Sequence, residues 1–314
     1  MSFFQKIEYE TSTFTINFFE EDFKQIAHAH RKVIQNQCSK IYENFITLDQ
    51  KSRSLFIKRL QESNDIENIC NGNITPLKDS EIPSNIKKDV IDLFKKLYSN
   101  ILLKEDSNFS KKYGSMKNHF KNFRANNKNL TLCPMCDLNT LKTEYDIIRD
   151  PYDHYLAKSI YPFSTINFNN LIPICNDCNS TGIKGNFDIL SINGKAFYPF
   201  DEKHQGITCG VSIEKKGESL EDIDWSFKFS NPEGKNEEIN TWKTTFQIEN
   251  RYIGHIKGHI SNWLKRNLRY KDKLSLGEYL IVETDSYLMK PVLDLLMNED
   301  ELLSSIEEMK KYTN

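Results

Sequence analysis

The sequence has no long hydrophobic run, because no stretch approaches the roughly 18 consecutive apolar residues that a transmembrane helix needs. We therefore expect no association with a membrane. The first residues reach the acidic Glu8 before any apolar run of the length found in secretion signals, so a cytoplasmic location is expected. Internal repeats and low-complexity linkers are also absent, which favours ordinary globular domains.

The chain has almost no net charge, because 42 Lys and Arg residues stand against 44 Asp and Glu residues and leave a formal charge of −2. Taken as a whole, this balance gives no indication of a nucleic-acid partner. Hydrophobic residues make up 38% of the sequence and aromatic residues 12%, which is typical of a folded protein rather than a disordered one. A length of 314 residues is enough for about two or three domains.

Hydrophobic periodicity predicts an α+β fold in three regions. Residues 1–110 are expected to form a helical N-terminal domain, residues 111–195 a central module, and residues 196–314 a C-terminal α+β domain. The clearest helical pattern runs from Ile86 to Ile101, with Ser84 as the expected N-cap. Further predicted elements are a helical segment at 20–45, a β-hairpin from 207–213 and 225–229, a long helix at 242–264, and short acidic helices at 291–311.

The sequence has seven cysteines, and their spacing is informative. Four of the seven cysteines form two Cys-x-x-Cys pairs, Cys133 with Cys136 and Cys175 with Cys178. Without a secretion signal a disulfide framework is not expected, so paired motifs point to metal or redox chemistry. Two pairs together can supply the four thiolates of a structural zinc site, which leaves no coordination position open for catalysis. A redox dithiol and four fortuitously buried cysteines are the alternatives.

The segment between the two pairs and the residues that follow it contain groups suited to hydrolytic chemistry. Asp153 and Asn179 offer oxygen ligands for a hard divalent cation, and His154 is a candidate base. A strand that reaches His154, a second strand at 171–174 and a helix from Asn179 would bring the three together. Because neighbouring residues of a strand point to opposite faces, Asp153 and His154 serve one site only if the strand bends there.

These motifs resemble the HNH endonucleases, also called ββα-metal nucleases. The resemblance extends over about residues 133–184, where Asp153-His154 is followed by Asn170-Leu171 and then by Asn179 directly after the second cysteine pair. The runs 153–156, 161–164 and 170–173 are similar to a bacterial subgroup associated with phage defence. Members of that subgroup, such as the nuclease component of Septu-type systems, act beside an ATPase partner, so an ATPase partner protein is expected.

The resemblance also implies roles for individual residues. His154 would be the general base, and Asp153 and Asn179 would hold one Mg²⁺ or Mn²⁺ ion. Asn170 would pin the loop between the strands so that His154 faces the phosphate, with Asn169 as the alternative. Lys184 and Lys158 would contact flanking phosphates, although Lys184 follows Asn179 at a longer spacing than the usual Asn-x-x-Lys of the family.

Charge is distributed unevenly along the chain. Residues 111–136 contain six basic side chains, among them Lys117, Lys121 and Arg124, and no acidic one. Aromatic side chains lie between them, so this segment could follow a phosphate backbone or stack on bases. Residues 281–314 are in contrast acidic, with eight acidic and three basic side chains. We therefore expect residues 111–136 to contribute to nucleic-acid binding.

The function that follows is hydrolysis of DNA phosphodiester bonds by a metal-dependent HNH endonuclease with a structural zinc site. Two alternatives stay open at this point. The same site could cleave RNA such as tRNA, because the chemistry serves any accessible phosphodiester. The chain could also be a zinc-stabilised nucleic-acid-binding or adaptor protein with an inactive site.

Overall fold

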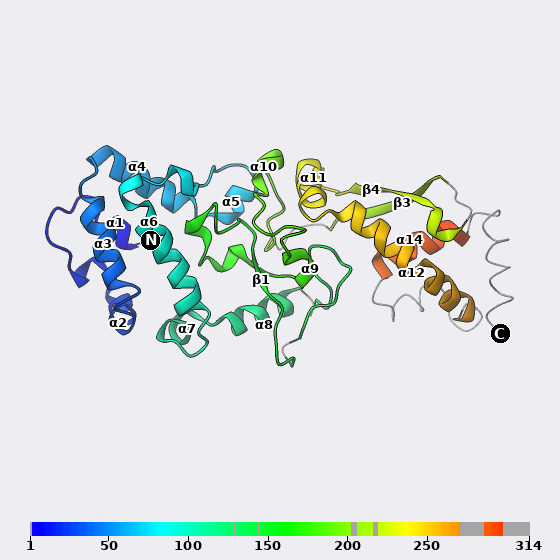
Figure 1. Ribbon diagram of the computed structural model, residues 1–314, viewed down its shortest axis with the longest axis horizontal. Helices are drawn as coiled ribbons and strands as arrows, with labels where there is room; N and C mark the ends of the chain where they lie inside the picture. The colour runs from blue at the N-terminus through cyan, green and yellow to red at the C-terminus, as the bar shows by residue number, and fades with distance from the viewer. Residues whose placement is uncertain are drawn as a thin grey trace. The chain divides into compact units, whose positions relative to one another are not determined.

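The computed structural model combines many helices with small antiparallel sheets, so the predicted α+β class is confirmed (Figure 1). It describes residues 2–127, 130–143, 145–201, 206–215, 219–270 and 286–297. Within these ranges the strands form two sheets of two strands each. No helix of the described ranges has the length and apolar character needed to cross a membrane.

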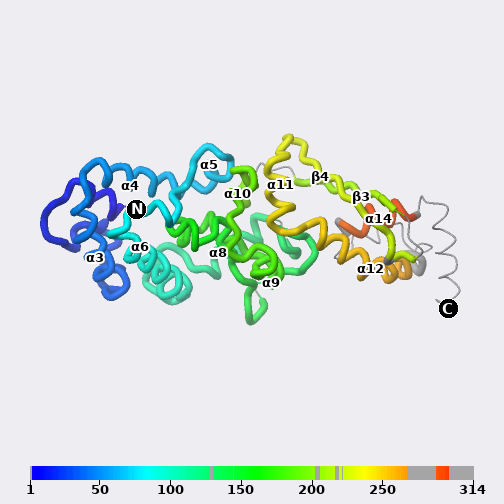
Figure 2. Tube along the Cα trace, turned by 45° about the horizontal axis from the view of Figure 1, so that its top comes forward, coloured from blue at the N-terminus to red at the C-terminus, as the bar shows by residue number. Residues whose placement is uncertain are grey.

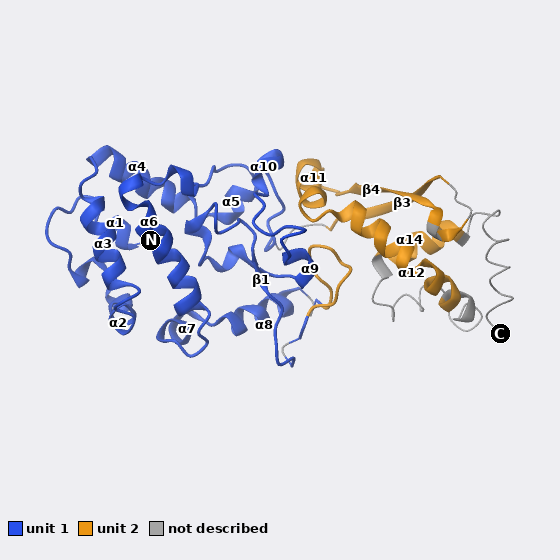
Figure 3. Ribbon diagram, in the orientation of Figure 1, with its two compact units in different colours: residues 1–130, 142–202 blue, residues 131–141, 203–314 orange. Residues whose placement is uncertain are grey.

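Contacts between Cα atoms divide the chain into two units (Figure 3). Unit 1 comprises residues 1–130 and 142–202, and unit 2 comprises residues 131–141 and 203–314. The region expected to form a helical domain lies within unit 1. Each unit is described separately below.

Unit 1 is mainly helical. Its helices are α1 (Ser2–Lys6), α2 (Glu21–Ala29), α3 (Gln35–Phe45), α4 (Gln50–Glu62), α5 (Ile66–Cys70), α6 (Ser84–Leu97), α7 (Asn108–Tyr113), α8 (Met116–Asn126), α9 (Asn176–Asn179) and α10 (Leu190–Asn193). The helical pattern predicted for residues 20–45 is two helices, because the chain turns at residues 30–34. Helices α3 and α6 pack side by side (Figure 2).

The prediction for α6 was right in its periodicity and wrong at its start. Ile86 and Val90 are fully buried on one face, as the spacing indicated. Ser84 is already inside the helix, and Pro83 occupies the N-cap position without a side-chain hydrogen bond. Proline at this position fits because its fixed φ and missing N–H cost the first turn nothing. The helix ends at Leu97 and continues as a π-helical turn, Tyr98–Leu102.

The core of unit 1 is rich in aromatic rings and includes part of the central region of the chain. Phe163, in a short 3₁₀ turn at Pro162–Ser164, is 1% exposed. Its ring lies 5.8 Å from that of Phe56 in α4 and 5.2 Å from that of Phe94 in α6, both edge to face. Such ring pairs add to the free energy of apolar burial. The loop that follows the first strand is therefore anchored in the N-terminal helices.

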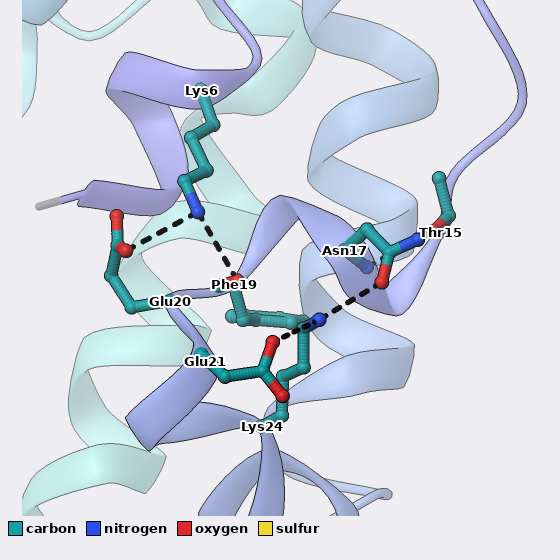
Figure 4. A network of polar contacts seen from close by, with 7 residues as sticks. All are labelled: Lys6, Thr15, Asn17, Phe19, Glu20, Glu21 and Lys24. Atoms are coloured by element: carbon teal, nitrogen blue, oxygen red, sulfur yellow. Dashed lines mark hydrogen bonds and ion pairs between the residues drawn. The ribbon is translucent and has the colours of Figure 1, made fainter.

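A polar network on the surface joins α1 and α2 (Figure 4). The ammonium of Lys6 donates to the Phe19 carbonyl at 3.4 Å and pairs with Glu20 at 3.3 Å. Lys24 donates to Asn17 Oδ1 at 3.0 Å and to Glu21 at 2.6 Å. Because exposed ion pairs contribute little free energy, these contacts orient the segment more than they stabilise it.

The small sheet of unit 1 consists of strands β1 (Tyr152–His154) and β2 (Leu171–Pro173). They pair antiparallel, with His154 opposite Leu171 and Asp153 opposite Ile172. Helix α9 begins directly after β2, with Cys175 as its N-cap. Two strands followed by a short helix therefore form one continuous local arrangement.

The described part of unit 2 contains a β-hairpin and the three α-helices named below. The hairpin of β3 (Thr208–Lys215) and β4 (Asp224–Ser230) confirms the alternating pattern read from the sequence. The helices are α11 (Asn236–Thr245), α12 (Ile248–Tyr270) and α14 (Ser286–Met297). The predicted long helix is broken between α11 and α12, where Gln247 adopts a φ of 50°. Of the predicted acidic helices, residues 298–314 lie outside the described residues.

Replacing Phe163 by alanine should lower the free energy of unfolding by about 3–5 kcal/mol, because the change leaves a cavity between α4 and α6. Urea denaturation followed by circular dichroism measures this loss. Leu55→Ala in α4 is the matched control, since Leu55 is 56% exposed and its truncation should cost less than about 1 kcal/mol. Equal costs for the two variants would contradict the placement of Phe163 in the core.

Candidate functional site

The four paired cysteines form one cluster. The sulfur atoms of Cys133, Cys136, Cys175 and Cys178 all lie within 4.8 Å of one another, and each residue is at most 4% exposed. None of the four forms a disulfide. Four thiolates bound to one zinc ion at 2.3 Å lie about 3.8 Å apart, so this grouping can hold a metal ion such as zinc.

Each cysteine pair sits in a tight turn of its own. In the first pair, the N–H groups of Cys136 and Asp137 both donate to the Cys133 carbonyl, at 3.3 and 2.9 Å. Asp137 then leaves the turn with a left-handed φ of 54°. In the second pair, the Cys175 sulfur accepts from the Cys178 N–H at 3.5 Å at the start of α9. These turns direct both sulfurs of a pair to the same side.

Strand β1 brings Asp153 and His154 to one pocket of about 200 Å³, which is also lined by Asn179 and Lys158. The sequence indicated that the two neighbours share a site only if the strand bends. The strand is three residues long and ends at His154, so the alternation of a regular strand does not separate them. Both side chains are nevertheless largely buried, at 3% and 7% exposed.

His154 is held in one orientation by its surroundings. Its Nε2 atom lies 3.1 Å from the Thr165 carbonyl, and its ring meets the edge of Tyr98 at 4.6 Å between centroids. A carbonyl only accepts, so Nε2 carries the proton and Nδ1 keeps its lone pair. Burial, together with the charges of Lys158 and Lys184, lowers the pKa of His154 to about 3, although the Thr165 hydrogen bond acts in the opposite direction. The imidazole is therefore neutral at neutral pH.

Asp153 presents one satisfied and one unsatisfied oxygen. Oδ1 accepts from the ammonium of Lys184 at 2.9 Å. Oδ2 is buried and has no hydrogen-bond partner within the described structure. Burial raises the pKa of Asp153, and the charge and hydrogen bond of Lys184 act against that rise. An orphaned carboxylate oxygen in a polar pocket is costly by itself and suited to a cation.

Lys184 does not lie where the sequence placed it. Its side chain is 0% exposed, and its ammonium donates to Asp153 Oδ1 and to the His154 carbonyl, both at 2.9 Å. A buried ammonium with these two acceptors cannot reach phosphates on the surface. The expected contact with flanking phosphates is therefore replaced by an internal ion pair.

Asn170 holds the loop between the two strands. Its Oδ1 accepts from the Leu156 N–H at 2.7 Å, and its Nδ2 donates to the carbonyls of Leu156 and Ser164, both at 3.1 Å. The residue is 0% exposed, so these bonds replace all contact with water. Asn169, the alternative at this position, is exposed and its backbone N–H donates to Asn167. Asn170 thus touches the loop rather than the pocket.

The predicted basic residues fall into two groups. Lys117 and Lys121 are exposed on α8, and Lys158 is exposed at the pocket with its ammonium 5.1 Å from the centre of the Tyr98 ring. Arg124 is instead 6% exposed, and its Nε donates to the Leu130 carbonyl at 3.0 Å. Its guanidinium ties the segment that follows α8 to the helix, so the prediction of a phosphate contact by Arg124 does not fit its burial.

Sequence reasoning missed two contacts of the site. Tyr98, from the π-helical turn, covers the His154 ring, and the Thr165 carbonyl fixes its tautomer. Neither residue is part of a motif. Tyr98 and His154 are 56 positions apart in the chain, so there is no local signal, and only the tertiary fold brings them together.

Comparisons with protein-family profiles, with curated proteins and with solved structures give no match to this chain. The chemistry of the site is therefore argued from its own residues.

Changing Cys175 to serine should remove the metal from the four-cysteine cluster, because a hydroxyl is a poor replacement for a thiolate ligand. Purified wild-type protein is expected to contain about one zinc ion per chain, measured by plasma mass spectrometry. Cys209→Ser is the matched control, since Cys209 lies outside the cluster. Full zinc content in Cys175→Ser would refute the assignment.

Changing Asn170 to aspartate should lower the free energy of unfolding by at least about 3 kcal/mol, because the new carboxylate would face two carbonyl oxygens in a buried loop. Chemical denaturation measures the effect. Asn169→Asp, one residue earlier and exposed, should cost less than about 0.5 kcal/mol. A similar cost for both variants would show that the three hydrogen bonds of Asn170 do not hold the loop.

Proposed function

We propose that the chain is a metal-dependent endonuclease of the HNH type that hydrolyses phosphodiester bonds of DNA. The observation that carries the proposal is that Asp153, His154 and Asn179 line one pocket. Strand β1 supplies Asp153 and His154 and the short helix α9 supplies Asn179, with β2 between them in the chain, in the order that the resemblance implies. The neutral imidazole, the unpaired carboxylate oxygen and the amide together have the groups that such hydrolysis needs.

The pocket residues fit a hard divalent cation such as Mg²⁺ or Mn²⁺. Asp153 Oδ2 is buried without a hydrogen-bond partner, which a cation ligated there would relieve. Asn179 would supply a second oxygen from the end of α9. A bound cation would stabilise the negative charge that develops on the phosphate and its leaving oxygen.

His154 would accept the proton of the attacking water at Nδ1. The hydrogen bond from Nε2 to Thr165 keeps the other proton in place and prevents the ring from turning. Tyr98 limits the ring from one side. An anionic phosphate beside the ring would stabilise the imidazolium as it forms, and so offset the effect of burial on the pKa of His154.

The four-cysteine cluster would hold a structural zinc ion. Four thiolates would fill the coordination shell of the zinc ion, so the chemistry of the reaction would fall to Asp153, His154 and Asn179 alone. The zinc ion would contribute to folding, because zinc binding to a closed site stabilises the folded chain directly.

DNA is the proposed substrate, with RNA as the outcome that the assay must separate. Lys117 and Lys121 on α8 and Lys158 at the pocket offer exposed positive charge in unit 1. These charges recognise phosphate and do not distinguish the sugar. An ATPase partner and a role in phage defence are expectations from the resemblance alone.

Changing His154 to alanine should lower the rate of DNA cleavage about 10²- to 10⁴-fold, because the water then loses its base. Supercoiled plasmid and a matched RNA are incubated with Mg²⁺ or Mn²⁺, and nicked, linear and fragmented products are quantified. His28→Ala is the control, since His28 is exposed on α2 and does not line the pocket. Its rate should equal that of wild type.

Three results would decide against the proposal. Equal rates for wild type and His154→Ala would remove His154 from the mechanism. Cleavage of RNA with intact DNA would change the substrate. Nucleic-acid binding without cleavage under either metal would support the inactive adaptor instead.

A further inference from the structure

The charge of the pocket is unusual for a cation site. Asp153 is the one carboxylate among the described residues that line it, and its charge is balanced by the buried ammonium of Lys184 at 2.9 Å. Lys158 also lines the pocket and is exposed. The pocket residues together with Lys184 therefore have a formal surplus of one positive charge.

A divalent cation is expected to bind such a site only weakly when no phosphate is present. Sites that hold Mg²⁺ commonly use one or two carboxylates and complete the ligand set with phosphate oxygens of the substrate. Here one oxygen of Asp153 is already bound to Lys184, so Oδ2 is the only charged ligand atom on offer. Lys158 and Lys184 repel a cation and attract an anion, and the effect is strong because the site is largely buried.

We infer that the pocket takes up the divalent cation and a phosphodiester cooperatively, with Lys184 and Lys158 making each dependent on the other. The phosphate neutralises the surplus positive charge and adds oxygen ligands, and the cation in turn neutralises the phosphate. By thermodynamic linkage, the phosphodiester raises the affinity for the cation by the same factor as the cation raises the affinity for the phosphodiester. This inference rests on the proposed function, because that function defines the cation and the phosphodiester as ligands of this pocket.

Lys184 sets the strength of this coupling. It neutralises Asp153 from inside the protein, where no solvent screens the pair, and its second bond to the His154 carbonyl fixes its position. Lys158 acts in the same electrostatic direction from the exposed side of the pocket. The two lysines differ in burial but are expected to affect the coupling in the same direction. Comparing their variants therefore separates the effect of charge from the effect of packing.

The test measures Mn²⁺ binding by electron paramagnetic resonance in the full-length His154→Ala protein, which keeps both lysines and should not cleave the probe. The probe is a short DNA duplex. Adding saturating duplex should raise Mn²⁺ affinity at least about tenfold, within the usual range of coupling between sites. The Mn²⁺ that the duplex itself binds is measured in the same way with the Asp153→Asn variant, which lacks the carboxylate ligand. This amount is subtracted from the Mn²⁺ bound in the presence of duplex.

The lysine variants, each combined with His154→Ala, identify the origin of the coupling. Lys184→Met and Lys158→Gln should each raise Mn²⁺ affinity without duplex and reduce the coupling at least about threefold. Lys158→Gln keeps the test decisive if Lys184→Met fails to fold, because Lys158 is exposed. Lys58→Gln, on α4 with a side chain 72% exposed, is the charge-matched control and should change neither value.

Equal Mn²⁺ affinity with and without duplex would overturn the inference. Weaker Mn²⁺ binding in folded Lys184→Met would also overturn it, because Lys184 would then only position Asp153. Unchanged coupling in Lys158→Gln would overturn it as well, because the charge of Lys158 would then have no effect. The proposed function fails separately: a wild-type protein that shows coupling without cleaving DNA or RNA would retain the inference and lose the nuclease. Cleavage of DNA by a protein whose Mn²⁺ affinity does not depend on the duplex would retain the nuclease and overturn the inference.

Discussion

The candidate site depends on the burial of one ammonium group. Removing the charge of Lys184 from water costs several kcal/mol, and two oxygen acceptors at 2.9 Å offset that cost. Both acceptors belong to β1, one from the Asp153 side chain and one from the His154 backbone. The interaction therefore ties the segment after α9 to the strand, leaves Oδ2 as the Asp153 oxygen without a hydrogen-bond partner, and holds the backbone that carries the imidazole.

The N-terminal helices contribute to the site through the loop between the strands. Phe163 anchors that loop in the aromatic core, and Ser164 and Asn167 donate side-chain hydrogen bonds to the carbonyls of Ser63 and Asn64 at 3.1 and 2.8 Å. Asn170 closes the loop from within. The Thr165 carbonyl that fixes the His154 tautomer lies inside the same loop. The helical region thus supports the pocket structurally, besides any role in binding a partner.

Features with a local cause could be predicted from the sequence. The helical face of α6, the β3–β4 hairpin and the grouping of four cysteines follow from spacing alone. The burial of individual charged side chains could not be predicted in this way. Neither the burial of Lys184 against Asp153, 31 residues earlier, nor the bond of Arg124 to Leu130 has a signature in residue type, because a lysine or arginine is exposed in most contexts.

Charge also differs between the whole chain and the pocket. A chain with a formal charge of −2 has no overall field that would steer it to nucleic acid. At the pocket the balance is reversed, since the carboxylate is internally neutralised and Lys158 remains exposed. Such a short-range field acts only within about 10 Å at moderate salt. Recognition by this pocket would therefore follow close contact, and other surfaces of the chain or a second protein would have to bring the phosphodiester there.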